Sequence, residues 1–505
     1  MDKKLGTLLE YAKAEILKQP GTGDDYKDSD ITALVYDSRK IEEGCLFVCI
    51  KGANFDGHSK IAEAVEKKAA AVLVEYIPED QKSVLEGSDV IVIRVDDTRE
   101  GLGITAAAWF GHPAKKLKTI GITGTKGKTT STYIVKNILE NAGFKVGLIG
   151  TIEICTGSRV IPAKNTTPES YLVQEYFAEM VENKCDAVVM EVSSQGLMLS
   201  RVAGFTFDYG IFTNLSPDHI GKNEHKDFDD YLRCKKMLFS QCRTGIFNSD
   251  DKYFSRISEG CTCEVETFGT GEKADLRAYD LKPDKRGGAL CMTFKTSGRA
   301  ELDAMIDLPG SFSVYNALTA IAICLHFGVD KADILEALEK VSVKGRIEML
   351  PVSDDYTLMI DYAHNAMALN SLLTTLKEYD PGRIVALFGC GGGRDRDRRF
   401  EMGETSGNLA DFTIITSDNP RNEEPMDIIA DIEEGIKKTS GEYITVPDRK
   451  EAIGYAIDHA KKGDVIVLAG KGHEDYQEIK GVRHPMDERV LVRELLSERG
   501  IPVRF

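Results

Sequence analysis

The sequence lacks any hydrophobic run long enough to cross a membrane. A bilayer span needs roughly 18 apolar residues, and no segment of the 505 residues reaches that length. The first twenty residues also lack the apolar stretch of a signal peptide, because Glu10, Lys13, Glu15 and Lys18 interrupt them. We expect these twenty residues to form an amphipathic helix. The sequence therefore predicts a cytosolic protein without membrane insertion.

An excess of positive charge is missing as well. Lys and Arg number 64 against 81 Asp and Glu, which gives a net charge of -17. Proteins that bind nucleic acid need clustered Lys and Arg to contact the phosphate backbone, so no nucleic-acid partner is expected. An anionic ligand must be held by local basic clusters in an acidic surface.

The eleven cysteines do not form the pattern of a zinc site. The closest pair, Cys261 and Cys263, has no second Cys or His pair at the spacing that zinc requires. We expect reduced, mostly buried thiols that bind no metal.

Internal repeats and low-complexity segments are also absent, and the length predicts two to four domains. Pro113 closes "WFGHP" just before an apolar strand, and "VSVKGRIEM" forms a Lys- and Gly-containing link near residue 343. These positions divide the chain into three predicted domains, residues 1–112, 113–342 and 343–505.

Strand-like and helix-like runs alternate along the second and third segments. The second contains the apolar runs "KTIGIT", "KVGLIGTI", "DAVVMEVSS" and "YGIFTNLS", and the helical pattern "TTSTYIVKNILENAG". In the third, "RIVALFGC", "DFTIITSD" and "DVIVLAGKG" each precede a helical pattern. Such alternation is typical of parallel βαβ units. We predict an α/β protein with a central P-loop domain and a C-terminal Rossmann-like domain.

The stretch "GITGTKGKTTST", residues 121–132, joins a predicted strand to a predicted helix. The usual first glycine of a P-loop is missing, but Gly124 and Gly127 let backbone N–H groups approach phosphate oxygens. The helix N-terminus favours anions, Lys128 supplies a positive charge and Thr129 can hold Mg²⁺. The alternative is a glycine-rich turn with an exposed lysine. Lys-Thr-Thr at this junction favours phosphate binding.

Two later strands end in possible ligands for a hard cation. "VVMEVSS" carries Glu191, and "IFTNLSPDHI" carries Asn214, Asp218 and His219. Ligands of open α/β sheets gather at the carboxyl ends of strands, so these side chains could bind Mg²⁺ beside the phosphates. Taken alone, Glu191 could be an ordinary strand-end acid and His219 a structural histidine.

Eight motifs then resemble the Mur ligase family of peptidoglycan synthesis in their order: "GTKGKTT", "NTTPES", "MEVSS", "FTNLSPDH", "CKKMLF", "DYAH", "DNPRNEEP" and "GKGHEDYQ". The resemblance covers nearly the whole chain. It is strongest to the MurE branch, which adds the third amino acid to UDP-MurNAc-L-Ala-D-Glu. The unusual P-loop matches the family's own form, Gly-Thr-(Asn or Lys)-Gly-Lys-Thr-Thr.

The resemblance implies a mechanism in which ATP phosphorylates a substrate carboxylate and an amine then attacks the acyl phosphate. It implies an N-terminal α/β uridine-binding module, two Mg²⁺ ions and a CO₂-derived carbamate on Lys235. The implied catalytic residues are Lys128, Glu191, His219 and Lys235, and the implied metal ligands are Thr129, Glu191, His219 and carbamylated Lys235. Without the resemblance, Lys235 and Lys236 would be interpreted as a basic exposed helix face.

The resemblance also assigns substrate contacts. Those implied for ATP are Gly124, Thr125, Lys126, Gly127, Lys128, Thr129, Thr130, Asn316, Arg346 and Asp361. Those implied for UDP-MurNAc-L-Ala-D-Glu are Ser38, Ala53, Asn54, Phe55, Asn165, Thr166, Thr167, Ser193 and Arg201.

The incoming amino acid is expected to bind two loops of the third domain. Asp-Asn-Pro-Arg is the pattern of MurE enzymes that add meso-diaminopimelate, whose distal carboxylate needs an arginine and whose ammonium needs an acid. The implied pocket residues are Arg394, Asp418, Asn419, Pro420, Arg421, Gly470 and Glu474. L-lysine or another amino acid is the alternative, in which case Arg421 would be an exposed turn residue. A monomer is expected.

Some positions depart from the family. Gln195 replaces a His, Leu199 replaces a substrate-contacting Gln, residues 218–228 differ from the usual "DHLDYHG", and Ala366 stands where Pro is frequent. The first three leave room for a MurE-like paralogue. Folylpolyglutamate synthetase and MurF are rival ligases that the uridine-module match and "DNPR" argue against. A regulatory P-loop ATPase would explain Glu191 but neither the Lys235 segment nor the charged C-terminal pocket.

Overall fold

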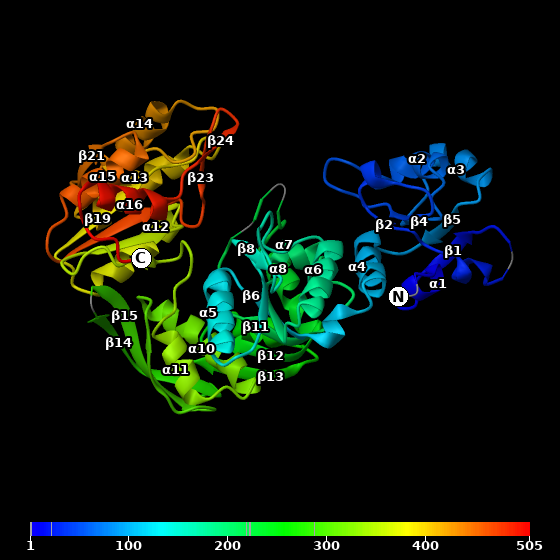
Figure 1. The fold of residues 1–505 in the computed structure, drawn as a ribbon, viewed down its shortest axis with the longest axis horizontal. Helices are drawn as coiled ribbons and strands as arrows, with labels where there is room; N and C mark the ends of the chain where they lie inside the picture. The colour runs from blue at the N-terminus through cyan, green and yellow to red at the C-terminus, as the bar shows by residue number, and fades with distance from the viewer. Residues whose placement is uncertain (1–2, 22, 219, 222–223, 287) are drawn as a thin grey trace. The chain divides into compact units, whose positions relative to one another are not determined.

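The computed structural model describes residues 3–21, 23–218, 220–221, 224–286 and 288–505. The chain forms two compact units, Met1–Phe268 and Gly269–Phe505. Figure 1 shows the order of their elements along the chain. Among the described residues, no helix is both long and apolar enough to cross a bilayer. The predicted domain boundaries near residues 112 and 343 stay a prediction.

The first unit begins with a five-stranded sheet in the order β1-β5-β4-β3-β2. Only β1 is antiparallel to its neighbour. The strands are β1 (Glu15–Lys18), β2 (Leu34–Val35), β3 (Leu46–Val48), β4 (Ala71–Val74) and β5 (Ile91–Arg94). The helices are α1 (Leu5–Leu8), α2 (Ile61–Glu66), α3 (Glu79–Glu86) and α4 (Thr98–Trp109), with 3-10 turns at Asp25–Asp28, Ser38–Lys40 and Gly57–Lys60.

The prediction of one amphipathic helix over the first twenty residues is wrong. Within the described residues 3–20, α-helix is limited to the four residues of α1, and Glu15–Lys18 form an edge strand whose side chains alternate in exposure. Pairing of β1 with β5 supplies the backbone hydrogen bonds that a helix would have made internally. Tertiary pairing therefore overrides the helical pattern.

The rest of the first unit is a larger sheet in the order β13-β12-β11-β6-β10-β7-β8-β9. All these strands are parallel except β8 and β9, which form an antiparallel extension. The strands are β6 (Lys118–Thr123), β7 (Val146–Ile149), β8 (Glu153–Cys155), β9 (Val160–Pro162), β10 (Ala187–Glu191), β11 (Phe207–Phe212), β12 (Cys242–Asn248) and β13 (Glu264–Gly269). The helices are α5 (Lys128–Asn141), α6 (Ser170–Glu182), α7 (Ser194–Met198), α8 (Phe228–Lys236) and α9 (Phe254–Ser258), with 3-10 turns at Pro113–Lys116 and Met237–Ser240.

The second unit starts with an antiparallel meander that the sequence analysis did not predict. It consists of β14 (Leu276–Arg286), β15 (Ala289–Gly298) and β16 (Asp303–Ile306), followed by helices α10 (Ser311–His326) and α11 (Lys331–Leu338).

A six-stranded sheet in the order β17-β18-β22-β19-β20-β21 follows in the same unit. Its strands are β17 (Glu348–Leu350), β18 (Thr357–Asp361), β19 (Arg383–Phe388), β20 (Phe412–Ile415), β21 (Glu442–Thr445) and β22 (Asp464–Ala469), and only β17 is antiparallel. The helices are α12 (Ala366–Lys377), α13 (Asp397–Leu409), α14 (Pro425–Ile436), α15 (Arg449–Asp458) and α16 (Glu488–Glu498). A hairpin of β23 (Tyr476–Ile479) and β24 (Val482–Pro485) precedes α16.

The central strands of both parallel sheets are fully buried. Every residue of β10 and of β22 is shielded from solvent, as expected where helices cover both faces of a parallel sheet. The predicted runs "KTIGIT", "DAVVMEVSS", "RIVALFGC" and "DVIVLAGKG" contain β6, β10, β19 and β22, so these strand predictions are confirmed.

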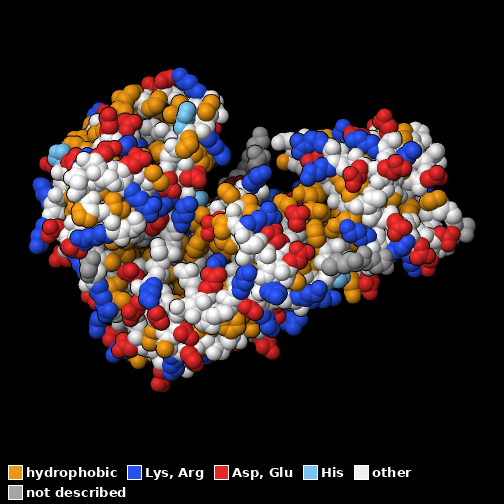
Figure 2. Space-filling model, viewed as in Figure 1, with side chains coloured by type: hydrophobic (Ala, Val, Ile, Leu, Met, Phe, Trp, Pro, Cys, Tyr) orange, Lys and Arg blue, Asp and Glu red, His pale blue; other side chains and the backbone are white. Residues whose placement is uncertain are grey.

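The charged side chains are mixed over the visible surface. On the face drawn in Figure 2, Lys and Arg are interspersed with Asp and Glu, in keeping with the net charge of -17. Any basic site for an anionic ligand on this face is therefore local.

Candidate functional site

The loop between β6 and α5 has the backbone of a phosphate-binding turn. Gly124 lies at φ 153°, and a Cβ there would come within 1.9 Å of Thr213 Oγ1. Gly127 adopts φ 85° at the N-cap of α5. Both positions therefore favour glycine, and the loop leads directly into a helix N-terminus that favours anions.

The segment after β11 holds this loop in shape. Asn214 O accepts from Thr125 N at 2.9 Å, and Asn214 Oδ1 accepts from Lys126 N at 2.9 Å. Asn214 Nδ2 in turn donates to Lys126 O at 3.0 Å. The backbone of Lys126 is thus clamped while its side chain is exposed, so the loop uses this residue through its main chain.

Glu191 connects the loop with two other segments. Its Oε2 accepts from Thr129 Oγ1 at 3.0 Å and from Thr151 Oγ1 at 3.0 Å, and its Oε1 accepts from Thr151 N at 2.8 Å. The Glu191 main-chain carbonyl accepts from Thr167 Oγ1 at 2.9 Å. Because the side chain is 1% exposed, its carboxylate is held in one place beside the first turn of α5.

Two lysines meet at the Gly124 carbonyl. Lys128 Nζ donates to Gly124 O at 2.8 Å and to Thr125 O at 3.1 Å, and Lys235 Nζ, from α8, also donates to Gly124 O at 2.8 Å. Lys235 is 1% exposed. Burial, with the nearby charge of Lys128, holds the pKa of Lys235 well below its ordinary value. Both causes favour the neutral form of the Lys235 amine.

A cavity of about 310 Å³ lies beside the loop in the first unit. The residues that line it are Lys128, Thr151, Lys164, Asn165, Thr166, Thr167, Ser193, Ser194, Gln195 and Arg201. Three of them are cationic, in a protein of strongly negative net charge, which suits an anionic ligand. The cavity thus brings the P-loop lysine together with the segments after β7, before α6 and at the start of α7.

Hydrogen bonds fix one wall of this cavity. Thr167 Oγ1 lies 3.2 Å from Ser193 Oγ and accepts from Ser193 N at 3.0 Å, and Arg201 Nη1 donates to Thr167 O at 3.1 Å. Arg201 Nε makes no hydrogen bond but lies 3.9 Å from Glu169 Oε2, so an ion pair also holds this guanidinium at the wall.

The second unit gathers charged residues around two loops of its parallel sheet. Asp418 and Asn419 follow β20 and are nearly buried, and Glu474 lies in the loop after β22. Asn419 Nδ2 donates to Glu474 Oε2 at 2.8 Å. Gly470 has φ 105°, and a Cβ there would lie 3.0 Å from Asp418 Oδ2. The two strand-end loops are therefore packed against one another.

Arg421 is held at the edge of the same loops in an unusual conformation. It lies at φ 53°, its Nη1 donates to Gly392 O at 2.6 Å, and its Nε lies 3.6 Å from Glu478 Oε2. Its side chain remains 30% exposed. A left-handed non-glycine residue often marks a functional constraint, and the guanidinium retains access to solvent.

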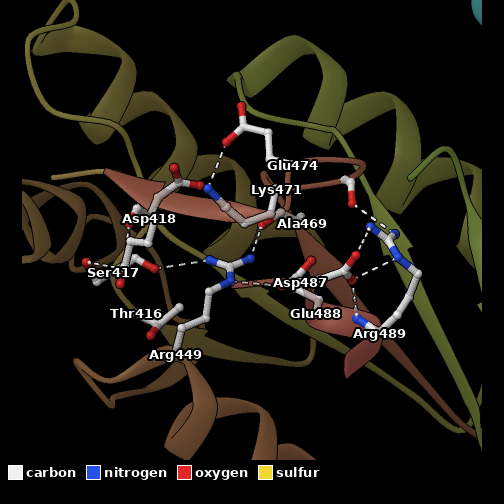
Figure 3. Close-up of polar contacts among 12 residues, drawn as sticks. Thr416, Ser417, Asp418, Arg449, Ala469, Lys471, Glu474, Asp487, Glu488 and Arg489 are labelled. Atoms are coloured by element: carbon white, nitrogen blue, oxygen red, sulfur yellow. Dashed lines mark hydrogen bonds and ion pairs between the residues drawn. The ribbon is translucent and has the colours of Figure 1, made fainter. Parts of the chain in front are cut away.

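Lys471 is a buried lysine of the loop after β22, and its side chain contacts Asn419 in the loop after β20. Figure 3 shows its Nζ beside the Glu474 carboxylate, to which it donates at 2.7 Å. Burial raises the pKa of Glu474, but Lys471 and Asn419 outweigh it and hold that pKa below the ordinary value. Glu474 is therefore an anion at neutral pH.

Asp361, Arg346 and Tyr362 form another cluster, where the linker after α11 meets the sheet. Asp361, at the end of β18, accepts from Ile347 N at 2.9 Å and from Ala363 N at 2.8 Å. Burial raises the pKa of Asp361, and Arg346 opposes that rise. Arg346 stacks over the ring of Tyr362 at 4.7 Å.

Comparison with known proteins agrees with these features. Three family models match, described as Mur ligase family, catalytic domain, over residues 30–110, Mur ligase middle domain over 122–324, and Mur ligase, glutamate ligase domain, over 345–472. A protein of Caldanaerobacter subterraneus subsp. tengcongensis, described as UDP-N-acetylmuramoyl-L-alanyl-D-glutamate–2,6-diaminopimelate ligase, is 43% identical over 98% of this chain and 99% of that protein. This chain belongs to the Mur ligase family.

Other relatives of this Mur ligase give the same result. A Clostridium acetobutylicum protein described as UDP-N-acetylmuramoyl-L-alanyl-D-glutamate–2,6-diaminopimelate ligase 1 is 43% identical over 93% of this chain and 95% of that protein. A solved structure of a ligase with that description has a TM-score of 0.70 at 28% identity, covering 95% of this chain and 98% of that one. MurF from Acinetobacter baumannii shares the fold, with a TM-score of 0.59 at 18% identity and 98% coverage of both chains.

The predicted fold class is confirmed, since the three models match successive parts of an α/β chain. Mur ligases are ATP-dependent ligases, so this chain is an enzyme of that kind, and the loop at residues 124–130 is its phosphate-binding loop candidate.

The structure brings several predicted site residues of this Mur ligase together. Lys128, Asn165, Thr166, Thr167, Ser193 and Arg201 share the cavity, and Thr129, Glu191 and Lys235 lie beside it through the contacts given above. Ser38, Ala53, Asn54 and Phe55 are not among the residues that line it. Phe55 is 53% exposed, and Asp37 forms with Arg39 the ion pair expected of a simple turn.

Other predicted residues lie elsewhere. Asn316 is nearly buried on α10, and Arg394 is exposed in the loop before α13. His219 lies outside the described residues. Thr130 is half-buried in the first turn of α5, and Pro420 is buried between Asn419 and Arg421.

Four residues of these sites were not predicted from the sequence: Thr151, Lys164, Ser194 and Lys471. Thr151 and Lys164 follow strands but belong to none of the eight motifs. Lys471 stands inside "GKGHEDYQ", where its neighbours Gly470 and Glu474 were predicted to contact substrate. Its sequence position between them was the one available signal.

Proposed function

We propose that this Mur ligase joins meso-diaminopimelate to UDP-MurNAc-L-Ala-D-Glu at the expense of ATP, through an acyl phosphate. The observation that carries the choice of amino acid is that two strand-end loops of the second unit, which contact each other through Asn419 and Glu474, carry both a partly exposed arginine, Arg421, and an acid, Glu474. A distal amino-acid centre carries a carboxylate, which an arginine can hold, and an ammonium, which an acid can hold. The relatives described as 2,6-diaminopimelate ligases support this choice.

The cavity in the first unit suits the other substrate. UDP-MurNAc-L-Ala-D-Glu ends in carboxylates, and Lys128, Lys164 and Arg201 supply positive charge around the cavity. The proposed role of the neutral lining residues, such as Asn165 and Ser193, is to orient the peptide by hydrogen bonds. Ser38 and the loop at residues 53–55 are proposed to contact the uridine nucleotide.

The residues present fit the implied cofactors. Thr129 Oγ1 and Glu191 Oε2, 3.0 Å apart, offer the oxygen ligands that Mg²⁺ prefers. A carbamate requires a neutral amine, and the burial of Lys235, which lowers its pKa, supports this assignment. With two Mg²⁺ bound, the carbamate and His219 would complete the ligand set, and the metals would supply charge neutralisation at the transferred phosphate.

The chain's own residues then account for the chemistry. A carboxylate is a poor acyl donor to an amine at neutral pH, so ATP first phosphorylates it, and the amine then attacks the acyl carbon and displaces phosphate. Lys128 stabilises charge on the transferred group, and the amides of Gly124–Thr130 hold the remaining phosphates. Asn316, Arg346 and Asp361 are proposed to contact the rest of ATP.

The test is a phosphate-release assay with UDP-MurNAc-L-Ala-D-Glu, ATP and Mg²⁺. The expected result is release with meso-diaminopimelate and little or none with L-lysine. Release with L-lysine alone would contradict the diaminopimelate assignment. Release without any amino acid would favour a regulatory ATPase.

We also propose that the enzyme is a cytoplasmic monomer. Cell fractionation and sedimentation equilibrium test the two parts of this proposal separately, and a membrane-bound pool or a stable dimer would contradict the respective part.

A further inference from the structure

Among the described residues of the loops after β20 and β22, Lys471 is the only cation that is wholly buried. Its Nζ donates to Asn419 Oδ1 at 3.0 Å, to Glu474 Oε2 at 2.7 Å and to Tyr476 O at 2.6 Å. All three donors of the ammonium are therefore used. A buried charge is costly unless it is paired and hydrogen-bonded, and here each partner belongs to the loops of the amino-acid pocket or their immediate continuation.

The contacts of Lys471 determine how Glu474 is presented. Glu474 Oε2 accepts both from Lys471 and from Asn419 Nδ2 at 2.8 Å. Asn419 Oδ1 is likewise shared between Lys471 and the backbone N–H of Glu478 at 2.9 Å. One carboxylate oxygen is thus fully committed to the protein, which orients the Glu474 carboxyl group as a whole.

The backbone beneath these side chains is held as well. Arg449, at the start of α15, donates to Ser417 O at 3.2 Å and to Ala469 O at 2.9 Å. These carbonyls lie just after β20 and at the end of β22, where the two loops begin. Arg449 also pairs with the buried Glu488 at 2.8 Å (Figure 3). The loops that carry Asn419 and Glu474 therefore start from fixed points.

We propose that Lys471 is a positioning residue of the amino-acid pocket, which locks Glu474 and Asn419 in the orientation that receives the ammonium group of the incoming amino acid. This proposal rests on the proposed function and adds a residue that would act through its two neighbours. Lys471 itself is buried and saturated by protein acceptors, so it does not need to touch the substrate.

The test compares Lys471→Met with the matched variant Lys450→Met. Lys450 also lies near two carboxylates, Glu494 and Glu498 at 2.9 and 3.0 Å, but on the exposed face of α15. Loss of a hydrogen bond to a charged group has a cost that corresponds to about a 10- to 100-fold effect. We expect Lys471→Met to raise KM for the amino acid by that factor, with KM for ATP and for the UDP-linked substrate unchanged. Lys450→Met should leave all three unchanged.

A merely structural role predicts a different result. It would lower the melting temperature and kcat without a selective change in KM for the amino acid, and that result would overturn the proposal. Should Lys471→Met fail to fold, Lys471→Gln retains a donor at the site and is assayed in its place, with the same selective rise expected.

A crystal structure of the variant tests the positioning without reference to activity. The Glu474 carboxylate is expected to move by about 1 Å or more, a displacement large enough to disturb a bound substrate. An unmoved Glu474 would overturn the proposal. Wild-type enzyme that is inactive with every amino acid would instead contradict the proposed function, while this structure would still decide the role of Lys471.

Discussion

The side chain of Lys235 is buried and donates to the Gly124 carbonyl of the P-loop. Burial and the charge of Lys128 lower its pKa, which favours the neutral amine that the proposed carbamate requires. We predict that Lys235→Ala loses most of the ligase activity and that short carboxylic acids restore part of it, because a free carboxylate can occupy the place of the carbamate. The measurement is phosphate release with and without added formate or acetate.

Full activity of Lys235→Ala would rule out a carbamate. The matched control is Lys236→Ala, since Lys236 is the next residue of α8 but is more exposed than Lys235. That variant should keep its activity and gain nothing from added carboxylate.

Arg421 is the residue on which the proposed choice of amino acid depends. Removing an arginine that binds a carboxylate costs about 2–5 kcal/mol, so Arg421→Ala should raise KM for meso-diaminopimelate by at least about 30-fold. KM for ATP should not change, because no ATP contact is assigned to this loop. Steady-state kinetics with each substrate varied in turn measure both values, and an unchanged KM for diaminopimelate would remove Arg421 from the pocket.

At this scale, motifs indicate which residues are candidates for the site, but not which residues hold them in place. Lys128 and Glu191 belong to the motifs "GTKGKTT" and "MEVSS" and could be named as candidates from the sequence, and Arg201 could be named from the resemblance alone. Thr151, which donates twice to Glu191, could not be predicted, because its role depends on where the end of β7 lies beside β10. The role of Lys471 could not be predicted either, because the complete burial of a lysine cannot be inferred from its neighbours in the sequence.

Among the elements, the helix pair α13 and α14 packs through glycine. A Cβ at Gly435 would lie 2.0 Å from Phe400 O of the facing helix. Gly435→Ala should therefore force the helices apart and destabilise the second unit by about 1–3 kcal/mol. Calorimetry checks this, with Gly87→Ala as control, because a Cβ at Gly87 would meet nothing within 4 Å. Equal melting temperatures for the two variants would contradict the packing argument.

The loop after β16 carries a carboxyl group that titrates abnormally. Burial raises the pKa of Asp307 from 3.8 to about 6. The folded protein therefore binds this proton more tightly than the unfolded chain, so its stability falls as pH rises from about 4 to 6, and the full cost persists above pH 6.

Asp307→Asn removes that cost. We expect it to stabilise the protein at pH 8 by about 1–2 kcal/mol, a value reduced because the side chain is partly exposed. The gain should shrink toward pH 4.5. Thermal unfolding at both pH values measures it, and an equal gain at the two would show that the pKa is not the cause.

The success of prediction also differed between kinds of element. The parallel strands are continuous apolar runs buried on both faces, such as β10 and β22, and their pattern is visible in the sequence. The meander was missed because β14 is mostly exposed and contains Pro283, so its strand character comes from pairing with β15. The edge strand β1 was also missed, because its strand character comes from pairing with β5.

At the scale of the whole molecule, the residues proposed to bind ATP are divided between the two units. Those of the P-loop, residues 124–130, lie in the first, and Asn316, Arg346 and Asp361 lie in the second. The proposed amino-acid pocket is also in the second unit, whereas the cavity with Lys128 is in the first. Each turnover should therefore require residues of both units, and ATP should be consumed only when all substrates are present.

Mass spectrometry of the reaction product tests this account most directly. With UDP-MurNAc-L-Ala-D-Glu, ATP, Mg²⁺ and meso-diaminopimelate, we predict a product whose mass equals the sum of the UDP-linked substrate and the amino acid less one water, with one ADP formed per product. ADP formed without that product, or the corresponding product from L-lysine in a mixture of equal amounts of both amino acids, would contradict it.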